Sequence, residues 1–352
     1  MYPYTREWSV DSININRYKA IKDNWEYSRK CINDIRECLK QSESKISSEV
    51  ITIAAAGSLG RMEANREVSD ADLIILLSDN IELDSQEATE IYNSIWEILN
   101  PLKLERPKAT GVFAKPINQK QLLSSIGKAD EEYATYGKRL LLILETQPLY
   151  RDASYTQVIN AIIERYADKY VKQDSKKEWT LLLNDLIRYF RSLAVNYQWD
   201  FNNDVEKWAI RNIKLRHSRL VMYSGLLMLI GEASKVRVDK VNWLQEKLKM
   251  TPLERIAWVY ERNEDWSFHR VIGHYNTFIL NMNDPKVREA LNYNPSELSS
   301  ENSGGDFYED RYTKNEFASL KANSDGLIAE LLRFVFARRG DWSERFFEYL
   351  IF

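Results

Sequence analysis

The chain has 352 residues, of which 44% are hydrophobic and 29% are charged, and its formal net charge at pH 7 is −3. This composition is that of a soluble globular protein, and it excludes the disordered and fibrous classes. The 49 lysines and arginines are slightly outnumbered by 52 acidic residues, so duplex DNA is not an expected partner.

The two cysteines and the apolar segments indicate a cytoplasmic protein with no membrane partner. Cys31 and Cys38 lie in a stretch with helical spacing, about two turns apart, which is too far for a disulfide and fits a reducing compartment. The first eight residues lack a basic stretch followed by an apolar run. The longest apolar run, 220–231, is too short to cross a bilayer.

The first part of the chain alternates between helical and strand patterns. Apolar residues at helical spacing predict amphipathic helices, and short β-branched or aliphatic runs predict buried strands. We therefore expect a small mixed β-sheet with helices packed on it. The predicted strands cover 50–56, 73–77, 102–104 and 111–117, and the predicted helices cover 16–41, 85–99 and 118–126.

Beyond residue 132 the strand patterns almost vanish and long helical patterns follow. The fold class is therefore α+β, with an α/β domain over 1–132 and an all-α domain over 133–352. A segment rich in Pro, Ser, Asn and Gly, 292–315, predicts a loop before a final helical pair. The other predicted helices cover 138–144, 155–170, 177–197, 204–230, 241–250 and 252–261.

The segment 54–76 contains the residues best suited to chemistry. A buried strand that ends in Gly57 and Ser58 and leads toward a helix offers backbone N–H groups and a hydroxyl to phosphate oxygens. Asp70 and Asp72 lie two apart in an extended segment, so their carboxylates point to the same face. Such a pair suits Mg²⁺, with Mn²⁺ as a substitute, bound together with substrate phosphates.

This sequence, Gly-Ser-x-Gly-Arg-x-Glu followed by Ser-Asp-x-Asp-Leu, resembles the signature of the nucleotidyltransferase superfamily that includes DNA polymerase beta. It is most similar to the branch of the uridylyltransferase of the nitrogen-regulatory PII protein and its uncharacterised bacterial relatives. The resemblance implies that Asp70 and Asp72 hold the metal. It also implies that Arg61 and Glu63 brace the loop or touch the nucleotide, whereas taken alone they could form a surface ion pair. The motif residues that it assigns to nucleotide binding are Gly57, Ser58, Gly60, Arg61 and Glu63.

The family usually has a third carboxylate on a later strand. Glu105 is the preferred candidate by its position along the chain, although Arg106 stands where an apolar residue is expected. Glu145 is the other candidate, in a sequence that resembles a helix end. If neither carboxylate reaches the metal, the fold would bind nucleotide and catalyse poorly.

Two basic stripes in the helical half are candidate phosphate-binding surfaces. Their members repeat at i, i+4 and i+7 on consecutive predicted helices, so that the stripes could face each other near the metal site. The alternative is a solvated basic surface balanced by nearby acids. The stripes consist of Asn184, Arg188 and Arg191 on the first helix, and of Lys207, Arg211 and Lys214 on the second.

These observations together predict a Mg²⁺-dependent nucleotidyltransferase that moves a nucleoside monophosphate from an NTP to an acceptor hydroxyl and releases pyrophosphate. The catalytic and metal-binding residues would be Asp70, Asp72 and Glu105. The acceptor could be a protein, a small molecule or a short RNA end. The competing hypothesis is a regulatory or protein-interaction module that kept the fold and the nucleotide but lost turnover.

Overall fold

The structure is a computed structural model of the chain, and it belongs to the α+β class, as the sequence predicts. It describes residues 6–66, 71–108, 110–124, 126–128, 131–167, 179–203, 205–235, 239–293 and 314–351. Asp70 and most of the loop predicted over 292–315 lie outside these residues.

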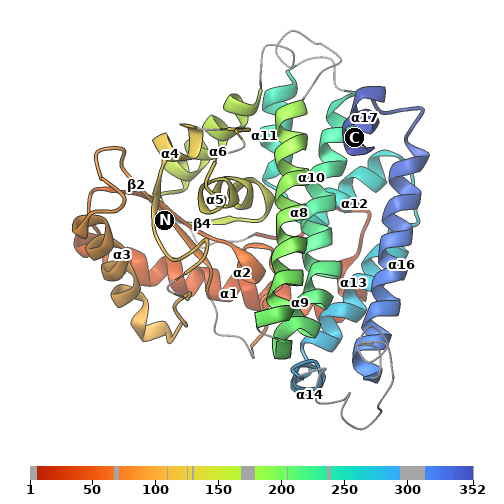
Figure 1. Cartoon of the computed structure of the whole chain (residues 1–352), viewed down its shortest axis with the longest axis horizontal. Coiled ribbons are helices and arrows are strands. Elements are labelled where there is room, and N and C mark those ends of the chain that lie inside the picture. Colours follow the sequence, from red (N-terminus) through yellow and green to blue (C-terminus); the bar gives the residue numbers. More distant parts are fainter. Residues whose placement is uncertain are drawn as a thin grey trace.

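A four-stranded mixed sheet forms the centre of the N-terminal part (Figure 1). Its strand order is β3-β2-β1-β4, with β1 antiparallel to both β2 and β4, and β3 parallel to β2. The strands are β1 (Val50–Ala55), β2 (Leu73–Leu77), β3 (Ile117–Asn118) and β4 (Gln147–Tyr150).

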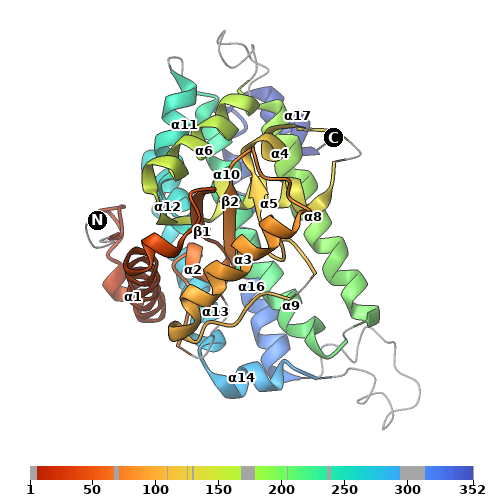
Figure 2. The ribbon, with the colours of Figure 1, turned by 90° about the vertical axis from the view of Figure 1, so that its left-hand side faces the viewer.

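Both faces of this sheet are covered by helices, which explains why its strands are apolar on both sides. Ile53 and Ile75 point into a core shared with α1 (Lys19–Gln41) and α3 (Gln86–Leu99). Their chain neighbours Ala54 and Ile74 point into the opposite core, which continues without a break into the helical half. Figure 2 shows α3 in front of β1 and β2, with the long helices behind them.

The helices of the second face and of the C-terminal half share this larger core. Helix α10 is buried on nearly every side, and it packs against α12, α8, α11 and α5. The helices are α2 (Gly57–Gly60), α4 (Gln119–Ser124), α5 (Tyr133–Leu144), α6 (Asp152–Tyr166), α8 (Thr180–Asn203), α9 (Trp208–Lys214), α10 (Leu220–Ala233), α11 (Lys240–Leu248), α12 (Pro252–Arg262), α13 (Phe268–Met282), α14 (Pro285–Ala290), α16 (Asn315–Ala337) and α17 (Glu344–Ile351).

The predicted strands at 102–104 and 111–117 are largely wrong. A 3₁₀ turn (Asn100–Leu102) and a single bridge at Glu105 replace the first, and only Ile117 of the second belongs to β3. Proline explains this, because Pro101, Pro107 and Pro116 each remove a donor that a strand ladder would need.

Three further differences affect the C-terminal half. Strand β4 was not expected there, and its Pro148 is tolerated because β4 is the edge strand of the sheet. Helix α13 was not among the predicted helices, although its buried residues recur at helical spacing. The single helix predicted over 204–230 is divided by a π-helical turn, Leu215–Arg219, between α9 and α10.

The structure and the sequence agree on the cysteines, since Cys31 and Cys38 are both free thiols. None of the helices in the described residues combines the length and apolar character needed to cross a membrane.

Candidate functional site

The two halves of the sequence motif come together at the end of β1. The backbone N–H of Ala56 donates to the carbonyl of Asp72 at 2.7 Å, which extends the β1–β2 pairing by one step. Gly57 then turns the chain into α2 with a φ of +64°, a conformation that favours glycine. A Cβ added to Gly57 would lie 2.3 Å from Oδ2 of Asp72, so the carboxylate packs directly against the glycine backbone.

This contact predicts a large difference between two glycine substitutions. Gly57→Ala is expected to destabilise the protein by more than about 1 kcal/mol, because it adds left-handed backbone strain and a clash with Asp72. Gly273→Ala on α13 is the matched control, since its added Cβ would meet nothing within 4 Å. It is expected to stabilise the helix by about 0.5–1 kcal/mol. Urea denaturation of both variants measures the two effects, and equal stabilities would contradict this account.

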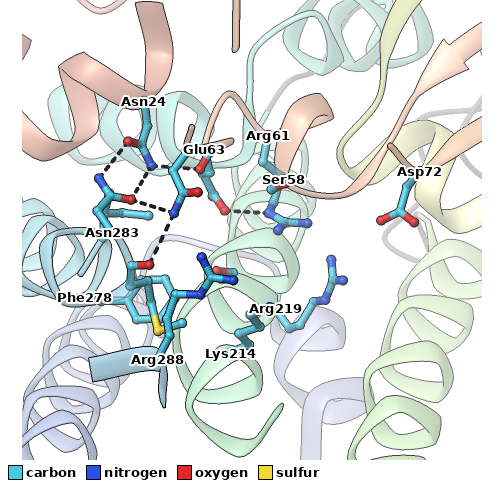
Figure 3. A pocket seen from close by; sticks show the side chains of 14 residues that line it. Asn24, Ser58, Arg61, Glu63, Asp72, Lys214, Arg219, Phe278, Asn283 and Arg288 are labelled. Atoms are coloured by element: carbon cyan, nitrogen blue, oxygen red, sulfur yellow. Dashed lines mark hydrogen bonds and ion pairs between the residues drawn. The ribbon is translucent and has the colours of Figure 1, made fainter. Parts of the chain in front are cut away.

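Ser58 and Asp72 line a cavity of about 140 Å³ between the sheet and the helical half, here called the first cavity. Figure 3 shows Asp72 at one end, and Asn24 and Asn283 at the other. Basic side chains from the helical half reach the space between these ends. These basic side chains are Lys214, Arg219 and Arg288.

Glu145 lies beneath this turn and is almost fully buried. One carboxylate oxygen accepts the backbone N–H of Gly57 at 2.8 Å. The other pairs with Nη1 of Arg61 at 2.5 Å and with Nη1 of Arg219 at 3.2 Å. Glu145 therefore joins the motif turn to the helical half, and it uses the Gly57 N–H that the resemblance assigns to phosphate.

Arg61 and Glu63 extend this buried network toward the first cavity. Nε of Arg61 donates to Glu63 at 2.8 Å, and the Tyr275 hydroxyl donates to the other Glu63 oxygen. Burial acts to lower the pKa of Arg61, but the carboxylates of Glu145 and Glu63 outweigh it and hold that pKa well above its usual value. Both Arg61 and Glu63 line the first cavity while bracing its wall.

The π-helical turn shapes the opposite wall. Lys214, Ser218 and Arg219 all line the first cavity, and Lys214 and Arg219 lie five positions apart, a π-helical and not an α-helical spacing. His217 anchors the turn from behind: its Nδ1 donates to the carbonyl of Ile213 at 2.8 Å. Burial lowers the pKa of His217 to about 4, which keeps the ring neutral at pH 7.

Glu105 lies in a separate cavity of about 540 Å³, here called the second cavity. Asp72 and Arg219 line both cavities, so Glu105 shares a pocket with Asp72 but not with Ser58. Among the described residues, no group of three His, Cys, Asp or Glu side chains is arranged to hold a metal ion. Asp70 lies outside the described residues.

The basic stripes do not face each other across one cavity. Lys214 lines the first cavity and Lys207 the second, whereas the remaining four residues line neither. Arg188 instead pairs with Glu131 at 3.0 Å and with Asp185 at 3.2 Å. The other residues outside the two cavities are Asn184, Arg191 and Arg211.

Several residues of the first cavity were not predicted from the sequence. Arg219 does not continue the α-helical spacing of the basic stripe, because the π-helical turn lengthens the repeat before it. A sequence pattern based on the α-helical period therefore could not place Arg219 in the cavity. Arg288 and Asn283 come from α14 and the turn before it, far along the chain.

The chain matches no family model, no curated protein and no solved structure.

Proposed function

We propose that the protein is a Mg²⁺-dependent nucleotidyltransferase that transfers a nucleoside monophosphate from an NTP to an acceptor hydroxyl. The observation that carries this proposal is that Ser58 and Asp72 share a cavity with three basic side chains of the helical half. A carboxylate, a hydroxyl and several cations around one cavity suit a metal-bound triphosphate. The motif 54–76 supports the proposal through its resemblance to nucleotidyltransferases.

The chemistry of the first cavity changes along its length in a way that suits a nucleotide. Asn24 and Asn283 lie at the end away from Asp72 (Figure 3), where they are hydrogen-bonded to each other, and Asn65 donates to Asn283. Phe278 and Met282 add apolar surface to the same cavity. Amide groups beside apolar surface suit a nucleobase, and the basic end suits its phosphates.

The residues present fit a magnesium ion in the form that proteins commonly use. Mg²⁺ is usually held by one or two carboxylates together with substrate phosphates, so Asp72, with Asp70 two positions earlier, would suffice. The bound ion would neutralise charge on the phosphates and on the attacking oxygen.

The chain's own groups would orient and stabilise the reactants. Ser58 would donate its hydroxyl to a phosphate oxygen, while Lys214 and Arg288 would offset the triphosphate charge. The acceptor oxygen would bond to the α-phosphorus as the bond to the β-phosphate oxygen breaks, which releases pyrophosphate. The hydroxyl proton would pass to the exposed Glu105 carboxylate and then to water.

The second candidate function is a nucleotide-binding module with little turnover. The placement of Glu105 outside the first cavity favours it, because of the three expected metal ligands the described residues then supply Asp72 alone to that cavity. Incubation with each labelled NTP and Mg²⁺ or Mn²⁺ separates the two functions. Pyrophosphate release supports the transferase, whereas metal-dependent binding without release supports the module.

Lys214→Ala is expected to weaken NTP binding about tenfold, because it removes a cation from the proposed triphosphate site. Lys40→Ala is the control, since Lys40 is an exposed lysine at the end of α1. Isothermal titration with NTP in the presence of Mg²⁺ measures both affinities. An unchanged affinity in Lys214→Ala would remove the helical half from the nucleotide site.

A further inference from the structure

The second cavity adjoins the first at Asp72. Both cavities share Asp72 and Arg219, so ligands bound in them would meet at the Asp72 carboxylate. The second cavity has a volume of about 540 Å³ and is larger than the first, which has about 140 Å³. A molecule bound there could place a hydroxyl beside the motif residues.

Basic side chains outnumber acidic ones around this second cavity. Its acidic lining residues are Asp72 and Glu105. In the described part of the chain, neither Lys108 nor Lys207 is paired with a carboxylate. An anionic group would therefore gain favourable electrostatic energy there, and more so in a cavity than on an open surface. The four basic lining residues are Arg106, Lys108, Lys207 and Arg219.

Aromatic rings form another part of the wall. Phe113, Tyr133 and Tyr189 line the second cavity, and the rings of Tyr133 and Tyr189 are stacked with their centroids 6.4 Å apart. Tyr189 is held in place by burial, whereas Phe113 and Tyr133 are partly exposed. Such rings favour a flat ligand that can pack against them.

We propose that the second cavity binds the acceptor, and that the acceptor is a small molecule with a planar ring, an anionic group and a free hydroxyl. This inference rests on the proposed function. The acceptor hydroxyl oxygen would attack the α-phosphorus of an NTP in the first cavity, pyrophosphate would leave, and Glu105 would take the proton. Lys207 and the other basic side chains that line the second cavity would bind the anionic group of the acceptor.

Size and charge favour a small acceptor over a nucleic-acid end. A strand of RNA continues beyond one nucleotide, and it would meet a chain whose net charge is −3. The basic groups instead line a single cavity, where an anionic group could contact them. The binding of a short RNA oligonucleotide is measured as the alternative.

Two lysines at opposite ends of α9 allow a matched experiment. Lys207 lines only the second cavity, and Lys214 lines only the first. Phenyl phosphate, which carries a ring and an anionic group but no acceptor hydroxyl, serves as the probe. Its affinity is measured by isothermal titration with the full chain, in the absence and presence of saturating NTP and Mg²⁺.

Lys207→Ala is expected to weaken phenyl phosphate binding about tenfold and to leave NTP affinity within about twofold. Lys214→Ala is expected to weaken NTP binding about tenfold and to leave the affinity for phenyl phosphate within about twofold. Phe113→Leu keeps an apolar side chain and should weaken phenyl phosphate binding about fivefold, whereas binding of inorganic phosphate should not change.

Three results would overturn the proposal: no binding of phenyl phosphate, displacement of phenyl phosphate by NTP, or tighter binding of a short RNA oligonucleotide that is sensitive to Lys207→Ala. These outcomes are separate from failure of the proposed function. If NTP binds and responds to Lys214→Ala while phenyl phosphate does not bind, only the acceptor assignment fails. If NTP does not bind the wild-type chain, the nucleotidyltransferase proposal itself fails.

Discussion

Asp72→Asn is expected to lower Mg²⁺-dependent pyrophosphate release by about a hundredfold to a thousandfold. Asp72 is the motif carboxylate that packs against Gly57, and among the described residues no other carboxylate lines both cavities. Asparagine keeps the shape of the side chain but removes the charge that binds the cation. The rate of pyrophosphate release from each NTP measures the effect.

A second measurement makes this result independent of the acceptor. Mg²⁺ should tighten NTP binding to the wild-type chain, and Asp72→Asn should remove most of that gain. Asp34→Asn, at an exposed position on α1, is the matched control and should retain both properties. Normal metal dependence in Asp72→Asn would show that the cation is held elsewhere.

Glu145→Gln is expected to produce the largest loss of stability, about 3–5 kcal/mol. The substitution leaves two guanidinium groups, those of Arg61 and Arg219, without the carboxylate that pairs with both in a buried setting. Glutamine can still accept the hydrogen bond from the Gly57 N–H, so the loss of stability measures mainly the effect of removing the negative charge. Urea denaturation monitored by circular dichroism measures the free energy of unfolding.

The control for this prediction is Glu97→Gln, at an exposed position of α3, which should change stability by no more than about 0.5 kcal/mol. The alternative role of Glu145, that of third metal ligand, predicts a different pattern of stability and metal dependence. In that case Glu145→Gln would keep nearly wild-type stability and would change the Mg²⁺ dependence of NTP binding. Such a result would refute the structural role that its contacts indicate.

Local patterns were enough to predict the centre of the fold. The strands at Val50–Ala55 and Leu73–Leu77 were predicted because both faces are buried, which produces continuous apolar runs. The motif likewise predicted Ser58 and Asp72 as site residues, and both line the first cavity. Their proximity follows from the antiparallel pairing of two strands that are close in sequence.

Contacts between distant segments could not be predicted in this way. The sequence around Glu145 indicates a helix end, which is correct, but it contains nothing that specifies partners 84 and 74 positions away. Arg188 has the spacing of a phosphate-binding stripe, yet Glu131 and Asp185 neutralise it. A periodic pattern fixes the helix face on which a cation lies, but not the element that packs against that face.

Strand β4 has a consequence for how the chain folds. β1 lies between β2 and β4, and β4 comes from beyond the boundary at residue 132. A fragment that ended at 132 would lack β4, and β1 would present unpaired backbone groups along an open edge. It would also lack α5 and α6, whose buried residues share the core of Ala54 and Ile74. We therefore expect the N-terminal half to depend on the later segments for its folding, and to be prone to aggregation when it is produced without them.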